Sequence, residues 1–256
     1  MKVSIITSCF NREATIGGTI ESVLGQDYPD IEYIVIDGAS RDGSLNIIKS
    51  YEGRIARIVS EPDNGMYEAL NKGIRLATGD IVGLLHSDDF FIHKSIISDI
   101  VEVFKQTQAD LVYGNGLYVD AVDTDKVVRN WISGSYSHWK VGCGWLPLHP
   151  TVYIRRDVIE RHGLYDESYK IAADSEFLIR YLYEAELRIA YLNKYVLKMR
   201  MGGLSTDYSK RKQMWMEDVR LYKEHGFPGV FEKLMKMGWK IPQFIEAKIK
   251  KKFTDE

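Results

Sequence analysis

Two adjacent aspartates, Asp88 and Asp89, follow an apolar run at residues 81–85 and are the strongest candidates for chemistry in this sequence. Acidic side chains at the end of a buried strand are costly unless a partner neutralises them. Mg²⁺ or Mn²⁺ prefers carboxylate oxygens and can also bind the oxygens of a diphosphate. The alternative is a cap for the helix that follows, but two adjacent acids exceed what a cap needs. We therefore predict a divalent metal site at this pair.

Asp37 closes another apolar run, at residues 31–36, and a loop with Gly38 and Gly43 follows it. A carboxylate at the end of such a strand can accept hydrogen bonds from a nucleoside base or ribose. Glycine lets a ligand approach the backbone closely. The alternative is a loop in which Asp42 caps the next helix. We favour a ligand role for Asp37 and leave both roles open for Asp42.

Asp174 opens a stretch of helical period at residues 175–185, and a carboxylate is electrostatically favoured at a helix N-terminus. From these residues alone, Asp174 is a cap and Glu176 is an acid of the first turn. His86 is expected to line a site beside the acidic pair. No spacing of His and Cys matches a zinc site, and no nucleophile elbow of a serine hydrolase is present. Three histidines are expected on helix surfaces: His93, His162 and His225.

These residues need a scaffold, and the first third of the chain predicts one. Short apolar runs alternate there with stretches of helical period, an order that predicts a parallel sheet with right-handed crossovers. In such a sheet, ligands bind beyond the carboxyl ends of the strands, where the polar clusters fall. The predicted strands span 3–7, 31–36, 55–60 and 81–85, and the predicted helices span 15–25, 44–51 and 65–76.

The rest of the chain predicts a mixture of strands and helices. A Gly- and Trp-rich stretch at residues 133–150 is expected to be a loop near the site. The fold class is α/β, a Rossmann-like nucleotide-binding sheet with helices on both faces and a helical C-terminal extension. Helices are expected at 93–106, 157–162, 175–185, 210–225 and 231–252, and strands at 111–114, 117–119 (around Asn115-Gly116), 127–131, 151–154 and 189–199.

The composition narrows the class of protein. The 256 residues are 45% hydrophobic and 27% charged, which is typical of a globular domain, and the net charge of -2 argues against a nucleic-acid partner. Two cysteines are too few for a disulfide framework. No signal peptide and no apolar run of about 20 residues is recognisable. We therefore predict a cytoplasmic protein.

The C-terminal stretch interleaves lysines with apolar residues from Phe231 to Phe253. One interpretation is a basic amphipathic segment that makes peripheral contact with the inner face of the plasma membrane. The other is a tail helix docked on the domain, with a solvated lysine face. The pattern does not favour either one.

Four segments in order resemble glycosyltransferase family 2. They are the first strand with Asn11-Arg12, the run Tyr33-Ile34-Val35-Ile36-Asp37-Gly38-Ala39-Ser40, the run Glu61-Pro62-Asp63-Asn64-Gly65, and Ala77-Thr78-Gly79-Asp80 leading to the acidic pair. The resemblance covers about residues 1–203. It implies an inverting enzyme with an A-type glycosyltransferase fold, which moves a sugar from a UDP- or GDP-linked donor.

The resemblance also assigns roles. Asp174 is implied as the base that activates the acceptor hydroxyl, with Glu176 as a substitute. It implies a catalytic domain at 1–205, with a donor part at 1–90 and an acceptor part at 91–205, and an extension at 206–256. The implied donor-binding residues are Thr7, Asn11, Arg12, Asp37, Asp63 and Asp88; the metal ligands for Mg²⁺ or Mn²⁺ are Asp89 and Asp88; the acceptor side holds Gly144, Trp145 and His149.

Some features depart from the family pattern. Ser87 replaces the first acid of a strict Asp-x-Asp metal motif, and no Glu precedes Asp174. The Gln-x-x-Arg-Trp signature of processive synthases is absent, which predicts addition of a single sugar to a glycan or lipid-linked acceptor in cell-surface polysaccharide or lipid-linked glycan synthesis. A nucleotidyltransferase would need a Gly-rich basic loop after the first strand. A catalytically silent sugar-nucleotide-binding module should have lost the acids, which are present here.

Overall fold

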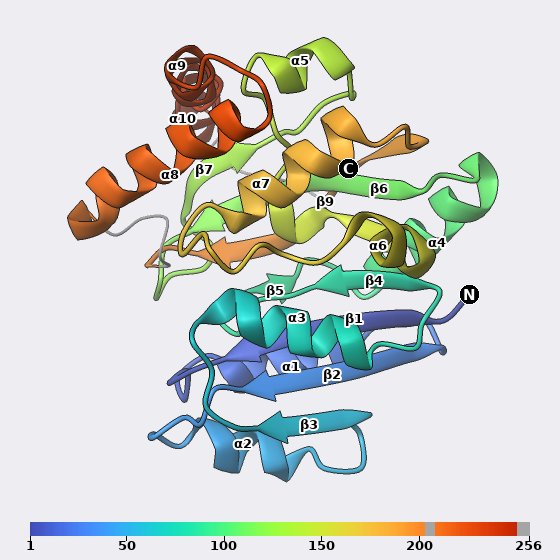
Figure 1. Cartoon of the computed structure of the whole chain (residues 1–256). Coiled ribbons are helices and arrows are strands. Elements are labelled where there is room, and N and C mark those ends of the chain that lie inside the picture. Colours follow the sequence, from blue (N-terminus) through green and yellow to red (C-terminus); the bar gives the residue numbers. More distant parts are fainter. Residues whose placement is uncertain (203–207, 250–256) are drawn as a thin grey trace.

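The computed structural model describes residues 1–202 and 208–249. Within these ranges the strands form one nine-stranded sheet in the order β3-β2-β1-β4-β8-β6-β9-β5, and β7 pairs with β6 (Figure 1). The predicted parallel sheet is confirmed, because β1 pairs in parallel with β2 and β4, and β2 with β3. These strands are β1 (Val3–Cys9), β2 (Ile31–Asp37), β3 (Arg57–Ser60) and β4 (Ile81–Leu84).

The second half of the sheet is mixed. β8 pairs antiparallel with both β4 and β6, so it joins the two halves into one sheet. β6 and β9 run parallel, and the short β5 pairs antiparallel with β9. These strands are β5 (Phe90–Phe91), β6 (Leu111–Val119), β7 (Val127–Trp131), β8 (Tyr153–Arg155) and β9 (Ile189–Arg200).

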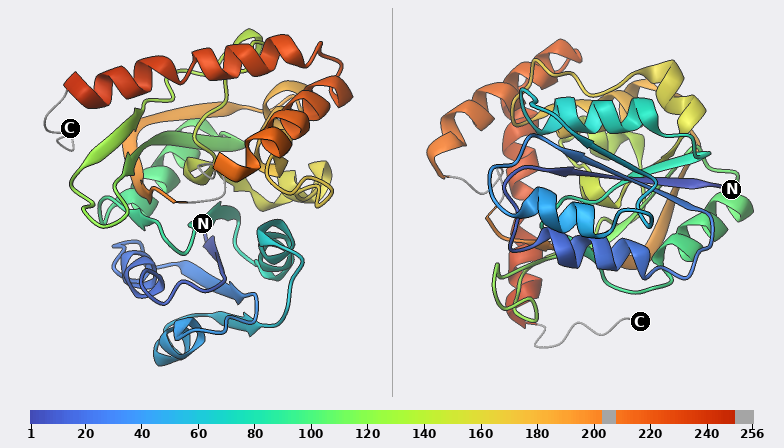
Figure 2. Two further views of the ribbon diagram at one scale, coloured as in Figure 1. Left: turned by 90° about the vertical axis from the view of Figure 1, so that its left-hand side faces the viewer. Right: turned by 90° about the horizontal axis from the view of Figure 1, so that it is seen from below.

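Helices cover both faces of the sheet (Figure 2). The alternation of side chains along the buried strands explains the two layers, since Ile5 belongs to one apolar cluster and Ile6 to the other. One face carries α3 (Met66–Leu76), α6 (Arg156–His162) and α7 (Ala173–Ile179); the other carries α1 (Ile16–Leu24), α2 (Ser44–Ser50) and α4 (Ile96–Thr107).

Two local predictions are wrong. Residues 111–119 form one continuous strand, not two strands separated by a turn at Asn115-Gly116. The register against β9 shifts on both sides of Asn115, and a Cβ on Gly116 would collide with Leu148, so this glycine permits close packing inside the sheet. The predicted loop at 133–150 contains α5 (His138–Gly142) and the start of a 3₁₀ turn (His149–Thr151).

The C-terminal helices dock on the rest of the fold, but with an unexpected orientation. They are α8 (Arg211–Glu224), α9 (Val230–Gly238) and α10 (Ile241–Ile249), and α10 packs against β7. Lys233 is only 6% exposed, and Lys236 also points inward. The tail helix of the second interpretation is therefore docked, but without a solvated lysine face on α9, where most apolar side chains are exposed instead. No helix in the described part of the chain is long and apolar enough to span a membrane.

Candidate active site

A cavity of about 510 Å³ opens beyond the carboxyl ends of β1 and β4 and extends to the C-terminal helices. Parallel strands bring the residues that follow them to one edge of a sheet, which explains why the predicted clusters meet there. The predicted site residues that line this cavity are Arg12, Asp63, Asp88, Asp89, Gly144, Trp145, His149 and Asp174.

Asp89 is the buried acid of the pair, with 1% of its surface exposed. Its Oδ1 accepts a hydrogen bond from the backbone N–H of Arg200 at 3.2 Å. Its Oδ2 is buried and has no hydrogen-bond partner among the residues that the structure describes. Burial, followed by the charge of Asp88, raises the pKa of Asp89 well above its usual range. A divalent cation would satisfy this oxygen and favour the ionised form, so Asp89 fits the predicted metal site.

Asp88 is the more exposed acid and lies between two arginines. Its Oδ2 is 3.7 Å from Nε of Arg12, and Nη1 of Arg200 donates to its backbone carbonyl at 2.6 Å. In the described ranges, no three His, Cys, Asp or Glu side chains lie close enough to hold a metal by themselves. A cation at this pair would therefore need further oxygens, which a diphosphate can supply.

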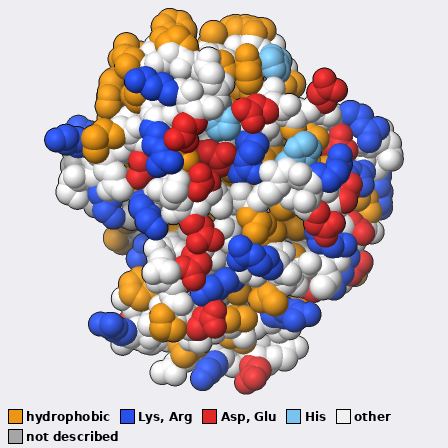
Figure 3. Space-filling model, viewed as in Figure 1, with side chains coloured by type: hydrophobic (Ala, Val, Ile, Leu, Met, Phe, Trp, Pro, Cys, Tyr) orange, Lys and Arg blue, Asp and Glu red, His pale blue; other side chains and the backbone are white. Residues whose placement is uncertain are grey.

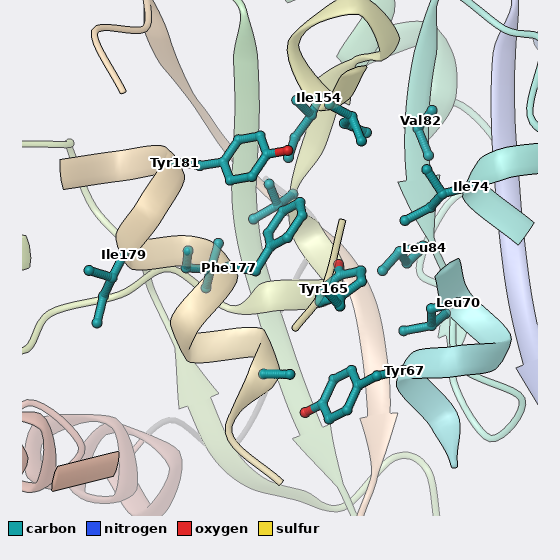
Figure 4. Packing of buried hydrophobic residues seen from close by; sticks show 14 of the residues in the cluster. Tyr67, Leu70, Ile74, Val82, Leu84, Ile154, Tyr165, Phe177, Ile179 and Tyr181 are labelled. Atoms are coloured by element: carbon teal, nitrogen blue, oxygen red, sulfur yellow. The ribbon is translucent and has the colours of Figure 1, made fainter. Parts of the chain in front are cut away.

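Asp174 lies in the first turn of α7, where the helix dipole favours a carboxylate. Its Oδ1 accepts hydrogen bonds from the backbone N–H of Ser175 at 2.7 Å and from the Ser175 hydroxyl at 3.2 Å. Tyr67 extends from α3 toward the start of α7 and donates to the carbonyl of Ile171 at 2.7 Å (Figure 4). The Asp174 backbone N–H lies 3.4 Å from the same hydroxyl. The carboxylate is thus fixed at one oxygen and faces the cavity.

Two histidines form the floor of the cavity near Asp174. The His86 and His149 rings stack with centroids 6.4 Å apart, and Nε2 of His149 hydrogen-bonds the Tyr165 hydroxyl at 2.6 Å. Burial lowers the pKa of His149 to about 4 and also lowers the pKa of His86. Both imidazoles are therefore neutral at neutral pH.

The predicted nucleoside-binding acids lie side by side after β2 and β3. Asp63 lines the cavity and accepts a hydrogen bond from the Gly65 N–H at 2.9 Å; burial raises its pKa. Gly38 is required here, because a Cβ at that position would collide with the Asp63 carboxylate. Asp37 is fully buried behind it and accepts hydrogen bonds from the Ser60 hydroxyl at 2.7 Å and the Ser40 N–H at 3.2 Å.

Four predicted site residues do not line the cavity: Asp37, Thr7, Asn11 and Glu176. The Thr7 hydroxyl is buried, donates to the Leu85 carbonyl at 2.8 Å and accepts from Tyr33 at 3.1 Å, so no free group on this side chain can contact a nucleoside. The Asn11 carboxamide accepts from the Arg41 N–H at 2.8 Å and joins two loops. Thr7 therefore supports the site from behind, and the exposed Asn11 holds a neighbouring loop, in contrast to the direct contacts predicted for them.

Glu176 is also turned away from the cavity, so its predicted role as substitute base is wrong. Its carboxylate binds the Arg180 guanidinium at 2.8 and 2.9 Å and lies 3.6 Å from Nε2 of His225. Burial raises the pKa of Glu176, but the hydrogen bonds from Arg180 and His225 outweigh this effect and lower the pKa below its usual value. His225 packs beside Glu176 and its side chain is 10% exposed, so the expectation that His225 is a surface residue is wrong.

The cavity is also lined by charged residues that the sequence motifs did not predict. Asp218 of α8 accepts hydrogen bonds from Lys233 and, at 2.7 Å, from Lys236. Lys236 also donates to the Ser175 hydroxyl at 2.7 Å, which links the C-terminal helices to the residue beside Asp174. The spacing of the lysines on α9 was visible in the sequence, but the side of the helix that faces inward was not. The other unpredicted charges on the wall are Arg129, Arg200 and Lys240.

The family model for Glycosyl transferase family 2 matches residues 4–163, more than half of the chain. The chain belongs to glycosyltransferase family 2. The uncharacterised glycosyltransferase Rv1514c of Mycobacterium tuberculosis is 35% identical over 180 residues, which cover 70% of this chain and 68% of that protein. The uncharacterised glycosyltransferase EpsJ of Bacillus subtilis is 28% identical, over 89% of this chain and 71% of its own length.

Solved structures agree with this family 2 fold. S. aureus TarS in complex with UDP-GlcNAc superposes with a TM-score of 0.70 at 18% identity, and covers 96% of this chain and 79% of the TarS chain. The mannosyltransferase PcManGT of Pyrobaculum calidifontis, in complex with GDP-Man and Mn²⁺, has a TM-score of 0.65 at 19% identity, over 96% of this chain and 73% of its own. The predicted A-type glycosyltransferase fold is confirmed.

Proposed function

We propose that this glycosyltransferase moves a single sugar from a UDP- or GDP-linked donor to an acceptor hydroxyl, with Mg²⁺ or Mn²⁺ as cofactor. The observation that carries the proposal is the buried, unpartnered Oδ2 of Asp89, beside Asp88, in the same cavity as Asp174. The complexes of TarS with UDP-GlcNAc and of PcManGT with GDP-Man and Mn²⁺ support this donor class. Asp63 is proposed to contact the nucleoside, with Asp37 behind it.

In the proposed reaction, Asp174 takes the proton from the acceptor hydroxyl while that oxygen forms a bond to the anomeric carbon. The bond between that carbon and the diphosphate breaks on the opposite face, so the configuration inverts. Asp88 and Asp89 would hold the divalent cation, which neutralises charge on the leaving nucleoside diphosphate. Arg12 and Arg200 flank the acid pair and are available to bind the same phosphates.

A donor screen tests this proposal. UDP- and GDP-sugars are added with Mn²⁺ or with EDTA, and thermal stability and release of nucleoside diphosphate are measured. We expect one class of sugar donor to stabilise the chain only when the metal is present. Without an acceptor, slow hydrolysis of this donor should release nucleoside diphosphate. Equal shifts with and without metal would overturn the metal assignment. Binding without release, even with acceptors, would favour a silent binding module.

We also propose that the acceptor is a glycan or lipid-linked molecule and that the outer face of α9 and α10 rests on an anionic bilayer. The PGL/p-HBAD biosynthesis glycosyltransferase of Mycobacterium bovis, 27% identical over 79% of this chain and 78% of its own length, supports a glycolipid acceptor. Apolar side chains gather at the top of the molecule, over α9 (Figure 3). Seven large apolar side chains of α9 and α10 are at least 43% exposed: Val230, Phe231, Leu234, Met237, Ile241, Phe244 and Ile245.

Their spacing of three and four residues puts them on one continuous face, as in interfacial helices. The exposed Lys248 lies on α10, and the sequence continues Lys250-Lys251-Lys252. Two copies of this face would bring like charges together, whereas an anionic bilayer attracts them, so we favour the bilayer. Sedimentation with phosphatidylglycerol vesicles tests this. The double variant Phe231→Ser, Leu234→Ser should no longer sediment with the vesicles. Unchanged sedimentation of this variant would overturn the bilayer proposal. So would a wild-type dimer that the double substitution dissociates.

A further inference from the structure

The wall of the cavity farthest from β1 carries more positive than negative charge. It is built by β7, α8, α9, α10 and the link between the last two helices. Among the described residues, this wall contributes Arg129, Lys236 and Lys240 to the cavity lining, but one carboxylate, Asp218. Asp218 is already shared between Lys236 and Lys233. Arg129 and Lys240 therefore have no acid within 4.0 Å in the part of the chain that the structure describes.

Arg129 is held rigidly with a free donor. The side chain is 8% exposed, and Nε donates to Oε1 of Gln243 at 2.6 Å. The guanidinium lies over the rings of Trp131 and Tyr118, with its central carbon 4.0 and 5.1 Å from their centroids. Nη2 is buried and makes no hydrogen bond to any described residue. A buried N–H group without a partner costs free energy, so Nη2 needs a hydrogen-bond acceptor that a bound ligand would have to supply.

Lys240 lies at the same wall, between α9 and α10. Burial, followed by the charges of Lys236, Arg129 and Lys233, lowers the pKa of Lys240 to about 7. An ammonium group in this position costs free energy until an anion joins it. Both side chains line the same cavity, and the charge of Arg129 acts on Lys240, so one anion bound near them would offset both positive charges.

We propose that Arg129 and Lys240 bind a phosphate group of the acceptor. A phosphate offers several oxygens to the planar guanidinium and carries enough charge to offset both cations. In the proposed function, the diphosphate of the donor would have its own partners in Arg12, Arg200 and the cation that Asp88 and Asp89 would hold. Arg129 and Lys240 come from other elements of the fold. Lys236, four residues before Lys240, donates to the Ser175 hydroxyl beside the proposed base. This inference rests on the proposed function, because it names the chemistry of the acceptor in that reaction.

The first test needs neither donor nor acceptor. Inorganic pyrophosphate is titrated calorimetrically in EDTA at pH 6.5 into the wild-type chain, Lys240→Gln and Lys248→Gln, a matched control on the outer surface of α10. We expect Lys240→Gln to weaken pyrophosphate binding at least about tenfold and Lys248→Gln to change it less than about twofold. Equal affinities in all three proteins would overturn the proposal. Circular dichroism confirms that each variant is folded.

The second test separates the two sources of phosphate. The titration is repeated after saturation with Mg²⁺ and the donor found in the screen. If the subsite belongs to the acceptor, pyrophosphate still binds and Lys240→Gln leaves donor affinity within about twofold. The acceptor assignment is wrong if bound sugar donor excludes pyrophosphate, or if Lys240→Gln lowers the affinity for the sugar donor about tenfold. In either case Arg129 and Lys240 hold the diphosphate of the sugar donor. Should no donor bind, the proposed function fails, while the first titration still decides whether the phosphate subsite exists.

Discussion

Replacing Lys240 by methionine should make the protein more stable. Methionine keeps most of the length of the lysine side chain and removes the buried charge. The pKa of Lys240 falls from its ordinary 10.5 to about 7 in the folded chain. At about 1.4 kcal/mol per pH unit, this difference of about 3.5 units corresponds to an upper limit of about 5 kcal/mol. Because buried charges relax toward water, we expect a gain of roughly 2 kcal/mol, or about 4–8 °C in Tm.

The gain should depend on pH in a defined direction. Between pH 7 and pH 10.5, the unfolded chain binds one more proton at this position than the folded chain. The stability of the wild-type protein therefore rises with pH across this window. Below pH 7 both states are protonated, and the penalty stays at its maximum. The advantage of Lys240→Met is consequently largest at or below pH 7 and shrinks toward pH 9.

Thermal unfolding at pH 6 and pH 9, in buffers without phosphate, measures both effects. Lys248→Met is the control, since a substitution on the exposed side of α10 should change stability by no more than about 0.5 kcal/mol. A Tm for Lys240→Met that equals or falls below that of the wild type at pH 6 would refute the reasoning. It would mean that Lys240 already has a counter-charge in the folded chain.

Three further substitutions test the active site. Asp174→Asn should lower kcat by about 10²–10⁴ and leave donor affinity nearly unchanged, measured by steady-state kinetics and calorimetry; normal turnover would remove Asp174 as the base. Asp89→Asn should abolish the extra thermal stabilisation that donor gains from Mn²⁺, and a retained metal effect would count against the metal site. Glu176→Gln should destabilise the fold by about 3 kcal/mol, because it leaves Arg180 without its buried partner, whereas kcat of the folded fraction should stay within a few-fold. Lost turnover at unchanged stability would instead restore a catalytic role for Glu176.

The position of Asp63, Asp88 and Asp89 at the cavity could be predicted because the sequence signals of the parallel strands are local, although Thr7, Asn11 and Asp37 do not line the cavity. Buried strands that alternate between two apolar layers fix the position of Asp37 and Asp89 at strand ends. The acceptor half depends on tertiary contacts. Asn115-Gly116 has the composition of a turn, but Gly116 lies against Leu148 within a continuous strand. The period of α9 identifies two faces of opposite character, and only packing against Asp218 decides that the lysines point inward.

Thr7 and Glu176 show a second limit of sequence reading. A polar residue at a strand end or in a first helical turn has the same pattern whether it meets a ligand or a neighbouring side chain. Thr7 hydrogen-bonds to Leu85 and Tyr33, and Glu176 pairs with Arg180. Because these partners lie far away in the sequence or within the same helix, the motif alone could not distinguish support from direct contact.

The position of α9 and α10 has a consequence for the length of the acceptor. Lys236 of α9 lines the cavity, while the next residue, Met237, is 48% exposed, so the single helix α9 separates this part of the cavity from the outer face. An α-helix with its side chains is about 10–12 Å across. A bilayer on the outer face would therefore lie about that far from the phosphate subsite. Because Asp174 lines the same cavity as Arg129 and Lys240, both proposals together would favour an acceptor whose reacting sugar lies close to its lipid phosphate.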